Sequence, residues 1–431
     1  MFDVFKNAWK VEDIREKLLY TLLIVVIFRI GSAIPVPFLE PSALASMLQA
    51  NSGNLLGYLN MLTGGALSQA TVFALSISPY ITASIVIELL TVAIPALEKI
   101  AKEGPEGRKK ISKITRYTTV GLGLIQAYAY YVTLKNYGAV KAFDNGFQNA
   151  LVLVTILFMF TAGAMLVMWL GERIDEKGIG NGISMLLFAG IVSGGPRLVT
   201  TLWAYLTAGE AKYYFFVPAL IVIFVLLIAF IVLMNEAERR IPVQYAKRVV
   251  GRKQYGGQAS HIPVKVAMAG VLPIIFAGAL LSIPATIEAF VPAAEGSFWY
   301  GFYRLFDSNS WFFSLLYFVL IVGFSYFYVA IQYNPVEMAN NLQKSNGAIP
   351  GIRPGRPTSD FISKIIGKIT FIGALFLGVI ALLPTFIGAV SGIAGVNVGG
   401  TTIIIVVSVA LETARSLESQ MMMRHYKGFL E

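Results

Sequence analysis

Cysteine is absent from the 431 residues, and histidine occurs only twice, as His261 and His425. Without cysteine the chain has no disulfide, no thiolate nucleophile, no zinc–thiolate site and no iron–sulfur cluster. Both histidines lie in polar segments, so a haem or a catalytic metal is not expected either. We predict no cofactor and no metal site.

Charge is scarce as well. Asp, Glu, Lys and Arg make up 13% of the chain, and apolar residues make up 56%. Soluble domains carry about 25% charged residues. A bilayer core of roughly 30 Å requires about 20 helical residues for each crossing, and many apolar runs here are about that long. The composition therefore predicts an integral membrane protein with little soluble mass.

The apolar runs define about ten predicted spans. They lie at 18–34, 72–94, 114–137, 149–171, 182–206, 214–234, 264–290, 311–332, 367–388 and 401–421. Before the first span, Phe2, Phe5 and Trp9 fall at helical spacing among charges, which predicts an interfacial helix over 1–17. A charged start before an apolar run resembles a signal peptide, but no small-residue cleavage site follows. We interpret 18–34 as a retained span.

Basic residues are distributed very unevenly between alternate connecting segments. Of the 34 Lys and Arg, 28 lie in the N-terminal tail, the segments 95–116, 172–181, 235–265 and 333–368, and the C-terminal end from Arg415 onward. Five, namely Lys135, Lys141, Arg197, Lys212 and Arg304, lie toward the other side, and Arg29 lies within a span. Because basic loops stay in the cytoplasm, this asymmetry predicts that both termini are cytoplasmic.

The segment 59–70, LNMLTGGALSQA, is too short and too rich in glycine to span a membrane. One interpretation is an ordinary outer loop with a turn at Gly64–Gly65. The other is a short re-entrant helix, which is tolerated at membrane depth only where it lines a cavity or packs on protein. The residues of the segment alone leave both open.

Several long segments carry a family resemblance. They are VFALSISPYITASIVIELL from Val72, MWLGERIDEKGIGNGISMLL from Met168, RRIPVQYAKRVVGR from Arg239, YNPVEMANNLQKSNGAIPGIRPGRPT from Tyr333 and GGTTIIIVV from Gly399. Together with NMLTGGALSQA they resemble, in order and over nearly the whole chain, the signature segments of the SecY family. That family forms the central subunit of the bacterial protein-translocation channel.

The resemblance implies an all-α membrane protein with about ten transmembrane helices in two pseudo-symmetric five-helix halves around an hourglass pore. The implied divisions are the interfacial helix 1–17, an N-terminal half 18–206 with a plug at about 55–70, a sixth span within 207–234, a basic loop 235–263, spans seven and eight within 264–332, a basic loop 333–366, spans nine and ten within 367–421, and a tail 422–431. The implied plug comprises Asn60, Met61, Leu62, Thr63, Gly64, Gly65, Ala66, Leu67, Ser68 and Gln69.

The resemblance also implies an apolar ring at the waist of the pore, formed by Ile77, Ile81, Leu187, Ile191, Ile275 and Ile405. Apolar side chains at a constriction exclude water and ions by dewetting. Ile77 with Ile81, and Leu187 with Ile191, are i, i+4 pairs, so each pair shares a helix face. By spacing alone these positions are indistinguishable from the many other core or lipid-facing Ile and Leu, and only the motifs single them out.

Glu88 is a carboxylate inside a predicted span, where a charge is costly and usually marks function or pairing. The resemblance implies a lateral gate between the second and seventh spans that involves Thr82, Glu88 and Ala267. Relatives often carry Asn within VNMAG, whereas this chain has Ala267 in VAMAG, which weakens a polar lock. The alternative is that Glu88 caps the cytoplasmic end of its span.

Two cytoplasmic loops are long and basic. The candidate partner-binding residues are Arg239, Arg240, Lys247, Arg248, Arg252, Lys253, Arg353 and Arg356. They could simply set topology and contact anionic membrane lipids. The resemblance implies docking of the SecA motor ATPase or the ribosome, because Arg binds carboxylate and phosphate bidentately. It also implies the partner subunits SecE and SecG.

The function implied is a passive channel in the bacterial cytoplasmic (inner) membrane, not an enzyme. Signal sequences would open it, unfolded nascent or secretory polypeptides would cross it, and apolar segments would leave sideways into lipid. Two alternatives are a secondary transporter of a small solute or ion and a membrane-embedded lipid-modifying enzyme. Transporters usually carry paired intramembrane charges, and Arg29 and Glu88 are nearly the only deep charges here.

Overall fold

The computed structural model describes residues 8–40, 65–136, 138–141, 143–207, 211–245, 248–250, 253–255, 259–290, 293, 296–307, 310–391 and 400–427. The first part of this chain is helical. It contains α2 (Glu12–Gly31), α5 (Ser78–Ala93), α6 (Pro95–Lys102), α7 (Pro105–Asn136), α8 (Gly146–Lys177), α9 (Gly182–Ser193) and α10 (Gly195–Thr207).

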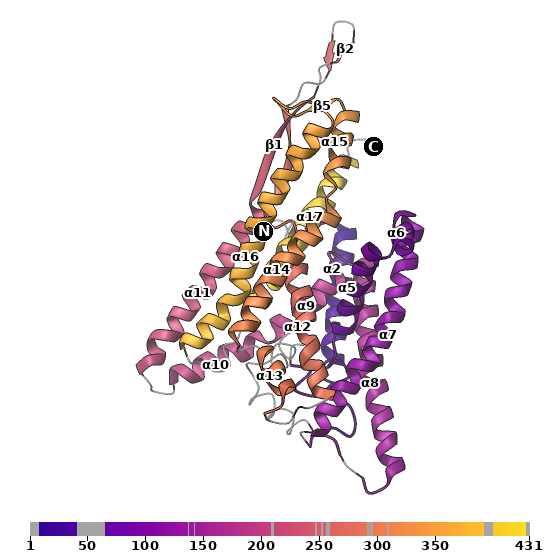
Figure 1. The fold of residues 1–431 in the computed structure, drawn as a ribbon, viewed down its shortest axis with the longest axis vertical. Helices are drawn as coiled ribbons and strands as arrows, with labels where there is room; N and C mark the ends of the chain where they lie inside the picture. The colour runs from indigo at the N-terminus through magenta and orange to yellow at the C-terminus, as the bar shows by residue number, and fades with distance from the viewer. Residues whose placement is uncertain are drawn as a thin grey trace.

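The second part combines helices with a small sheet. Its helices are α11 (Ala211–Glu236), α12 (Leu272–Phe290), α13 (Phe298–Leu305), α14 (Trp311–Gln332), α15 (Pro335–Lys344), α16 (Arg356–Ser391) and α17 (Gly400–Lys427). Its strands are β1 (Glu238–Tyr245), β2 (Arg248–Val250), β3 (Lys253–Tyr255), β4 (Ala259–Lys265) and β5 (Gly347–Ala348). The long helices run side by side, β1, β5 and α15 lie together at one end, and β2 projects beyond them (Figure 1).

Local capping explains where several helices begin. The Asn334 side chain accepts hydrogen bonds from the backbone N–H groups of Val336 and Glu337, with Pro335 at the first helical position of α15. Asn181 accepts from Ser184 N at the start of α9. Side-chain caps of this kind satisfy donors that have no partner within the helix, so these polar residues fix the starts of α9 and α15.

Five helices in the described chain are long and apolar enough to cross a membrane, and six if the bent pair α5–α6 is counted as one span. The five are α8, the run Gly182–Thr207, α11, the run Trp311–Lys344 and α16. The predicted spans 18–34, 114–137, 264–290 and 401–421 also fall largely on helices, namely α2, α7, α12 and α17. The chain is thus a mostly helical protein with several membrane-length apolar helices.

The structure differs from the predicted spans at several boundaries. Span 72–94 becomes helical only at Ser78, and 182–206 is broken at Gly194 between α9 and α10. The basic segment 95–116, predicted as a loop, is mostly helical and consists of α6 and the first part of α7. The axes of α5 and α6 meet at an angle of 102°. Ile94 is extended just before Pro95, because a residue that precedes proline disfavours the helical conformation.

The basic loop 235–263 contains strands that the span analysis did not predict. β1 pairs antiparallel with β4, with Ile241 opposite Ile262, and β5 pairs along the other edge of β1. Ile241 and Val243 are buried, and the residues between and beside them are exposed. This alternation is typical of a strand with one covered face, and a search for 20-residue apolar runs overlooks it.

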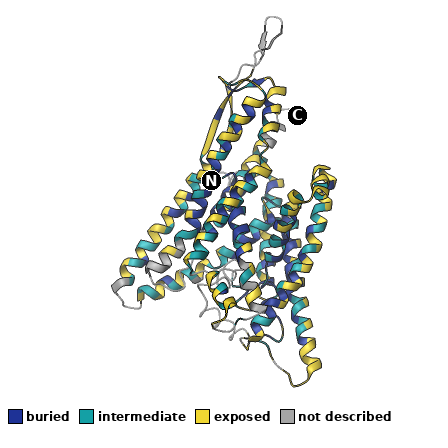
Figure 2. Ribbon diagram, in the orientation of Figure 1, coloured by how far each residue is buried: buried dark blue, intermediate teal, exposed yellow. Residues whose placement is uncertain are grey.

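Buried side chains form separate apolar cores. The N-terminal core joins α7 and α8 to the segments around residues 36–39 and 67–74, and its members extend from Val36 to Phe160. The C-terminal core joins α11, α12, α14, α16 and α17, from Leu227 to Leu411. The central junction, a third cluster, joins α2, α5, α8 and α9 to α17. Figure 2 shows buried residues concentrated along the middle of the helical region.

Candidate pore and partner-binding surface

The central junction contains most of the predicted ring. Ile77, Leu187 and Ile405 are buried within it, and Ile81 and Ile191 pack against it. They come from the start of α5, from α9 and from α17, which are far apart in the sequence. Ile275 is half-buried in α12, whereas Val271, one turn earlier, packs against the junction. The structure therefore brings five of the six predicted positions into one apolar cluster.

A tight turn holds α9 in this cluster. In the turn 178–182, Gly178 N donates to Ile174 O at 2.7 Å and Gly182 N donates to Asp175 Oδ1 at 2.7 Å. Ile179 N donates to the Thr21 hydroxyl of α2 at 3.2 Å. These bonds fix the turn to both α8 and α2, and with it the position of Leu187 one and a half turns along α9.

Glycine is required at the end of this turn. A Cβ on Gly182 would collide with the carbonyl oxygen of Gly171 and would lie 2.8 Å from Cβ of Ile174. Backbone atoms cannot yield as the end of a flexible side chain can. The motif GERIDEKGIGNGIS is therefore a helix–turn–helix contact, and our sequence analysis assigned no role to its Asp175 or Gly182. An acidic residue seven positions before a helix start is too weak a signal to reveal that contact.

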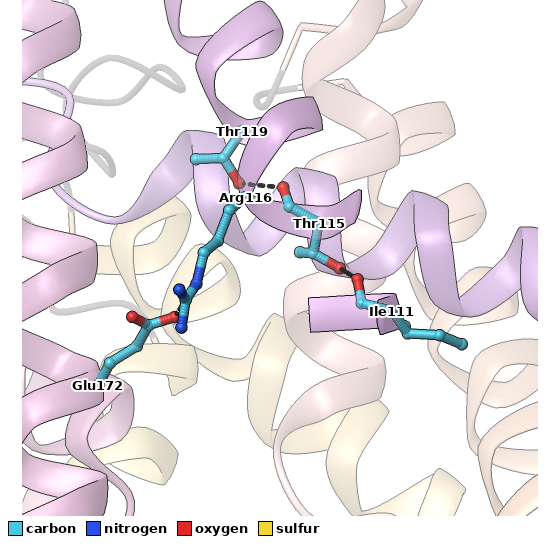
Figure 3. A network of polar contacts seen from close by, with 5 residues as sticks. All are labelled: Ile111, Thr115, Arg116, Thr119 and Glu172. Carbon is cyan, nitrogen blue, oxygen red and sulfur yellow. Dashed lines mark hydrogen bonds and ion pairs between the residues drawn. The ribbon is translucent and has the colours of Figure 1, made fainter. Parts of the chain in front are cut away.

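A polar network joins α7 to α8 next to this turn (Figure 3). Arg116 Nε lies 2.8 Å from Glu172 Oε1. On the same helix as Arg116, Thr115 donates to Ile111 O at 3.0 Å and Thr119 donates to Thr115 O at 2.7 Å. The Arg116 side chain is 49% exposed, so the pair contributes at most about 1 kcal/mol. It orients the two helices more than it stabilises them.

The predicted gate residues lie on two elements. Thr82 and Glu88 lie on α5, with Thr82 Oγ1 donating to Ser78 O at 3.0 Å. Glu88 is half-buried and makes no ion pair with any residue that the structure describes. Ala267 precedes α12 and lines a small cavity with residues of α14 and α16, among them Ser325 and Thr370. Elsewhere α12 contacts both α5 and α7.

The predicted plug is only partly described. Residues 60–64 lie outside the described chain. Gly65, Ala66, Leu67, Ser68 and Gln69 form turns, and Ala66 and Leu67 are buried. Leu67 packs in the N-terminal core and not in the central junction.

The basic candidates lie at the end of the molecule that carries the sheet. Arg239 and Arg240 are exposed on β1. Arg353 is exposed in the loop before α16, and Arg356 is the exposed first residue of α16. Arg248 and Lys253 lie on the paired strands β2 and β3, and Lys247 and Arg252 lie outside the described residues. Because β5 pairs with β1, the sheet brings the loop before α16 close to the base of the first basic loop.

These arginines differ in how far neighbours neutralise them. Arg240 Nε donates to Glu238 Oε1 at 2.7 Å, and this hydrogen bond holds the pKa of the Glu238 carboxyl below its usual value. Arg353 and Arg356 have no ion pair with any described residue. Their guanidinium groups are therefore available to an anionic partner.

The membrane-length helices around an apolar junction define a multi-pass α-helical membrane protein. The family model described as SecY matches residues 71–414. The chain therefore belongs to the SecY family. It is 44% identical to the protein translocase subunit SecY of Streptomyces griseus, with all of both chains aligned. The corresponding identities are 42% for Corynebacterium glutamicum, over 99% of each chain, and 39% for Mycobacterium tuberculosis, over all of each chain.

Solved structures agree on the fold. A structure described as that of a protein conducting channel is 19% identical, with a TM-score of 0.62 over 94% of this chain and 92% of that one. Sec61 in the canine ribosome-channel complex from the endoplasmic reticulum is 17% identical, with a TM-score of 0.57 over the same shares. At these identities the likeness concerns the fold alone.

Proposed function

We propose that the chain is the protein-conducting channel subunit of a translocase in the bacterial cytoplasmic membrane. It is a conduit rather than an enzyme: unfolded secretory polypeptides pass through it, and transmembrane segments leave it sideways into lipid. The observation that carries this proposal is the central junction, where Ile77, Ile81, Leu187, Ile191 and Ile405 gather from α5, α9 and α17. An apolar constriction of this kind excludes ions without making sequence-specific contacts to a passing chain.

The pore would lie between two halves of five spans each. Support comes from the cores: the N-terminal core contains only residues before 161, and the C-terminal core only residues after 223. The central junction contains residues of both parts, and so does a smaller cluster of Ala8, Ile14, Ile179 and Leu417. Two bodies that each have a core of their own can separate at their shared apolar contacts without unfolding either body, and an opening channel requires this.

The sideways exit would lie between α5 and α12. These helices contact one another, and each also packs on other helices of its own half. Thr82, Glu88 and Ala267 remain our candidates for this gate. The transporter alternative receives no specific support, because Arg29 and Glu88 form no ion pair with each other or with any other described residue.

The basic surface would bind the cytoplasmic machinery, either a SecA-type motor or ribosomal RNA, with anionic lipids at its rim. Its support is the exposure of Arg353 and Arg356 beside the sheet and the description of the Sec61 relative as part of a ribosome–channel complex. SecE and SecG are proposed as further subunits on the family resemblance.

Reversing the charge at both Arg353 and Arg356 to Glu is expected to reduce export sharply while leaving the protein inserted. Exposed charges contribute at most about 1 kcal/mol to folding, whereas reversal replaces attraction to an anionic partner with repulsion. The measurement is motor-driven import into vesicles together with the amount of inserted protein. Arg240→Glu is a comparison variant, because Arg240 is already paired with Glu238. Normal import by the double variant would reduce these residues to topology determinants.

The topology follows from the basic asymmetry. Reporters fused after Gly107 or Gly347 should be cytoplasmic, and reporters fused after Asn51 or Gly395 should be outside. Paired alkaline phosphatase and green fluorescent protein fusions give opposite signals on the two sides. A reversed signal at any of the four positions would contradict the proposed order of spans.

The function itself is tested by reconstituting the chain with its proposed partner subunits and motor into vesicles. A secretory polypeptide should become protected from protease in a manner that depends on the motor, on ATP and on this chain. Vesicles that accumulate a small solute but protect no polypeptide would favour the transporter alternative.

A further inference from the structure

The described end of the proposed plug is packed away from the pore. Ala66 is 2% exposed and Leu67 is 3% exposed. Leu67 and Ala70 belong to the N-terminal core, together with residues of α7 and α8, and not to the central junction that holds the ring positions. A segment that seals the pore in one state must leave it in another. Residues that are packed into the N-terminal core are therefore not expected to belong to that segment.

One side chain secures this end. Tyr130 of α7 donates from its hydroxyl to the backbone carbonyl of Leu67 at 2.9 Å. The Tyr130 side chain is buried, and its ring centroid lies 5.2 Å from that of Phe160. The same carbonyl also accepts from Ala70 N at 3.1 Å within the local turn. The Tyr130 bond is therefore the one that ties this turn to α7, and a hydrogen bond of this kind contributes about 1 kcal/mol.

Backbone pairing secures the residues that follow. Val36 N donates to Ala70 O at 2.9 Å, and Val72 N donates to Ile34 O at 3.0 Å. Pro35 and Thr71 face each other as an antiparallel bridge. The chain after the proposed plug is therefore tied to the end of the first span.

Thr71 closes the turn between these two attachments. Its backbone N–H and its hydroxyl both donate to Ala66 O, at 3.1 and 3.2 Å. Immediately before this closed turn, Gly65 has φ +87, a conformation that residues with a Cβ rarely adopt. The Gly65 carbonyl accepts from the Ser68 hydroxyl at 2.7 Å and from Gln69 N at 3.3 Å, so the hydrogen-bonded turn begins at Gly65.

We infer that Tyr130 is a positioning residue that anchors the C-terminal end of the predicted plug, so that residues 66–72 stay fixed in both the closed and the open state. The inference rests on the proposed channel function. It shortens the predicted plug of 60–69 at its C-terminal end. Anchoring one end of a plug keeps its effective concentration at the pore high, which favours rapid resealing.

The first test locks the anchor. Facing residues of an antiparallel bridge have Cα atoms roughly 4.5–5.5 Å apart, within the range that a disulfide requires. The chain contains no other cysteine, so the double variant Pro35→Cys/Thr71→Cys offers a single pair. Import into vesicles is measured under oxidising and reducing conditions, with both single variants and the unaltered chain in parallel.

The anchor model predicts that the disulfide forms and that the oxidised channel imports polypeptide at the same rate as the reduced one. Loss of import on oxidation, restored by reductant, would show that the segment around 71 must move and would overturn the inference. Failure of the disulfide to form would contradict the bridge itself. If the unaltered chain imports nothing, the proposed function fails instead, which is a separate result.

The second test removes the anchoring bond. Tyr130→Phe keeps the ring against Phe160 but removes the donor to Leu67 O, and the resting ion leak should rise roughly fivefold, the factor for one ordinary buried hydrogen bond. Tyr131→Phe is the matched control: Tyr131 is buried in the same core and makes no hydrogen bond to any described residue. Equal leak in the two variants, with thermal stability measured for both, would contradict the role given to Tyr130.

Discussion

Replacing Ile405 or Ile81 with Asn should produce a channel that leaks small ions at rest and exports substrates with defective signal sequences. Ile405 is 2% exposed within the central junction. An amide at this position would hydrate the apolar contact and weaken the closed state relative to the open one. A shift of about 1.4 kcal/mol changes that equilibrium tenfold, and burial of an unsatisfied polar group costs about that much or more.

The two effects should occur together because they have one cause. When the closed state is less stable, less binding energy from a signal sequence is needed to open the pore. Vesicle conductance measures the leak, and export of a substrate with a mutated signal measures selectivity. Ile→Leu at the same positions keeps the seal apolar and should change neither. Ile221→Asn, at an exposed position of α11, should reduce insertion without a leak. If the Asn variants leak no more ions and remain as selective as the unaltered channel, these residues do not form the seal.

Gly182→Val should strongly destabilise the protein and lower the yield of inserted protein. Its Cβ would collide with the carbonyl oxygen of Gly171, and the branched side chain would force α9 away from α8. Overpacking of a close contact costs roughly 3 kcal/mol, a large share of the 5–15 kcal/mol that holds most proteins folded. The displaced helix is the one that carries Leu187 and Ile191 into the central junction.

Thermal unfolding in detergent, together with the yield of inserted protein, measures this effect. Gly121→Val is the control with the same change in volume, because a Cβ at Gly121 of α7 has no atom within 4 Å. Loss of yield should be confined to the Gly182 variant. If Gly182→Val folds with unchanged stability, the turn 178–182 is not the fixed support of α9 that the structure shows.

Long apolar runs were predictable because their signal is physical and local. The spans at 149–171, 214–234 and 311–332 lie within α8, α11 and α14, since about 20 apolar residues have no other low-energy arrangement in a bilayer. The end of α5 was predictable to within a residue, at the proline that follows Ile94.

Contacts between distant segments could not be predicted in the same way. Nothing in the sequence pairs Tyr130 with Leu67, because that bond depends on how α7 packs against the segment before α5. The bond from Gly182 N to Asp175 depends likewise on how the turn 178–182 folds α9 back onto α8. The strands β1 and β4 were overlooked because their apolar residues alternate instead of running together. The ring positions came from the motifs of the family, and the placement of five of them in one cluster is what the structure adds.

The most direct test of the channel proposal records what the ring touches while a polypeptide is in transit. A photo-crosslinking amino acid would replace Ile81, Leu187 or Ile405 in turn, and a secretory chain would be arrested halfway across the membrane. The account predicts crosslinks from all three positions to the arrested polypeptide and none from the exposed α11 position Ile221. Crosslinks from Ile221 alone, or from none of the three, would mean that polypeptide does not pass through the central junction.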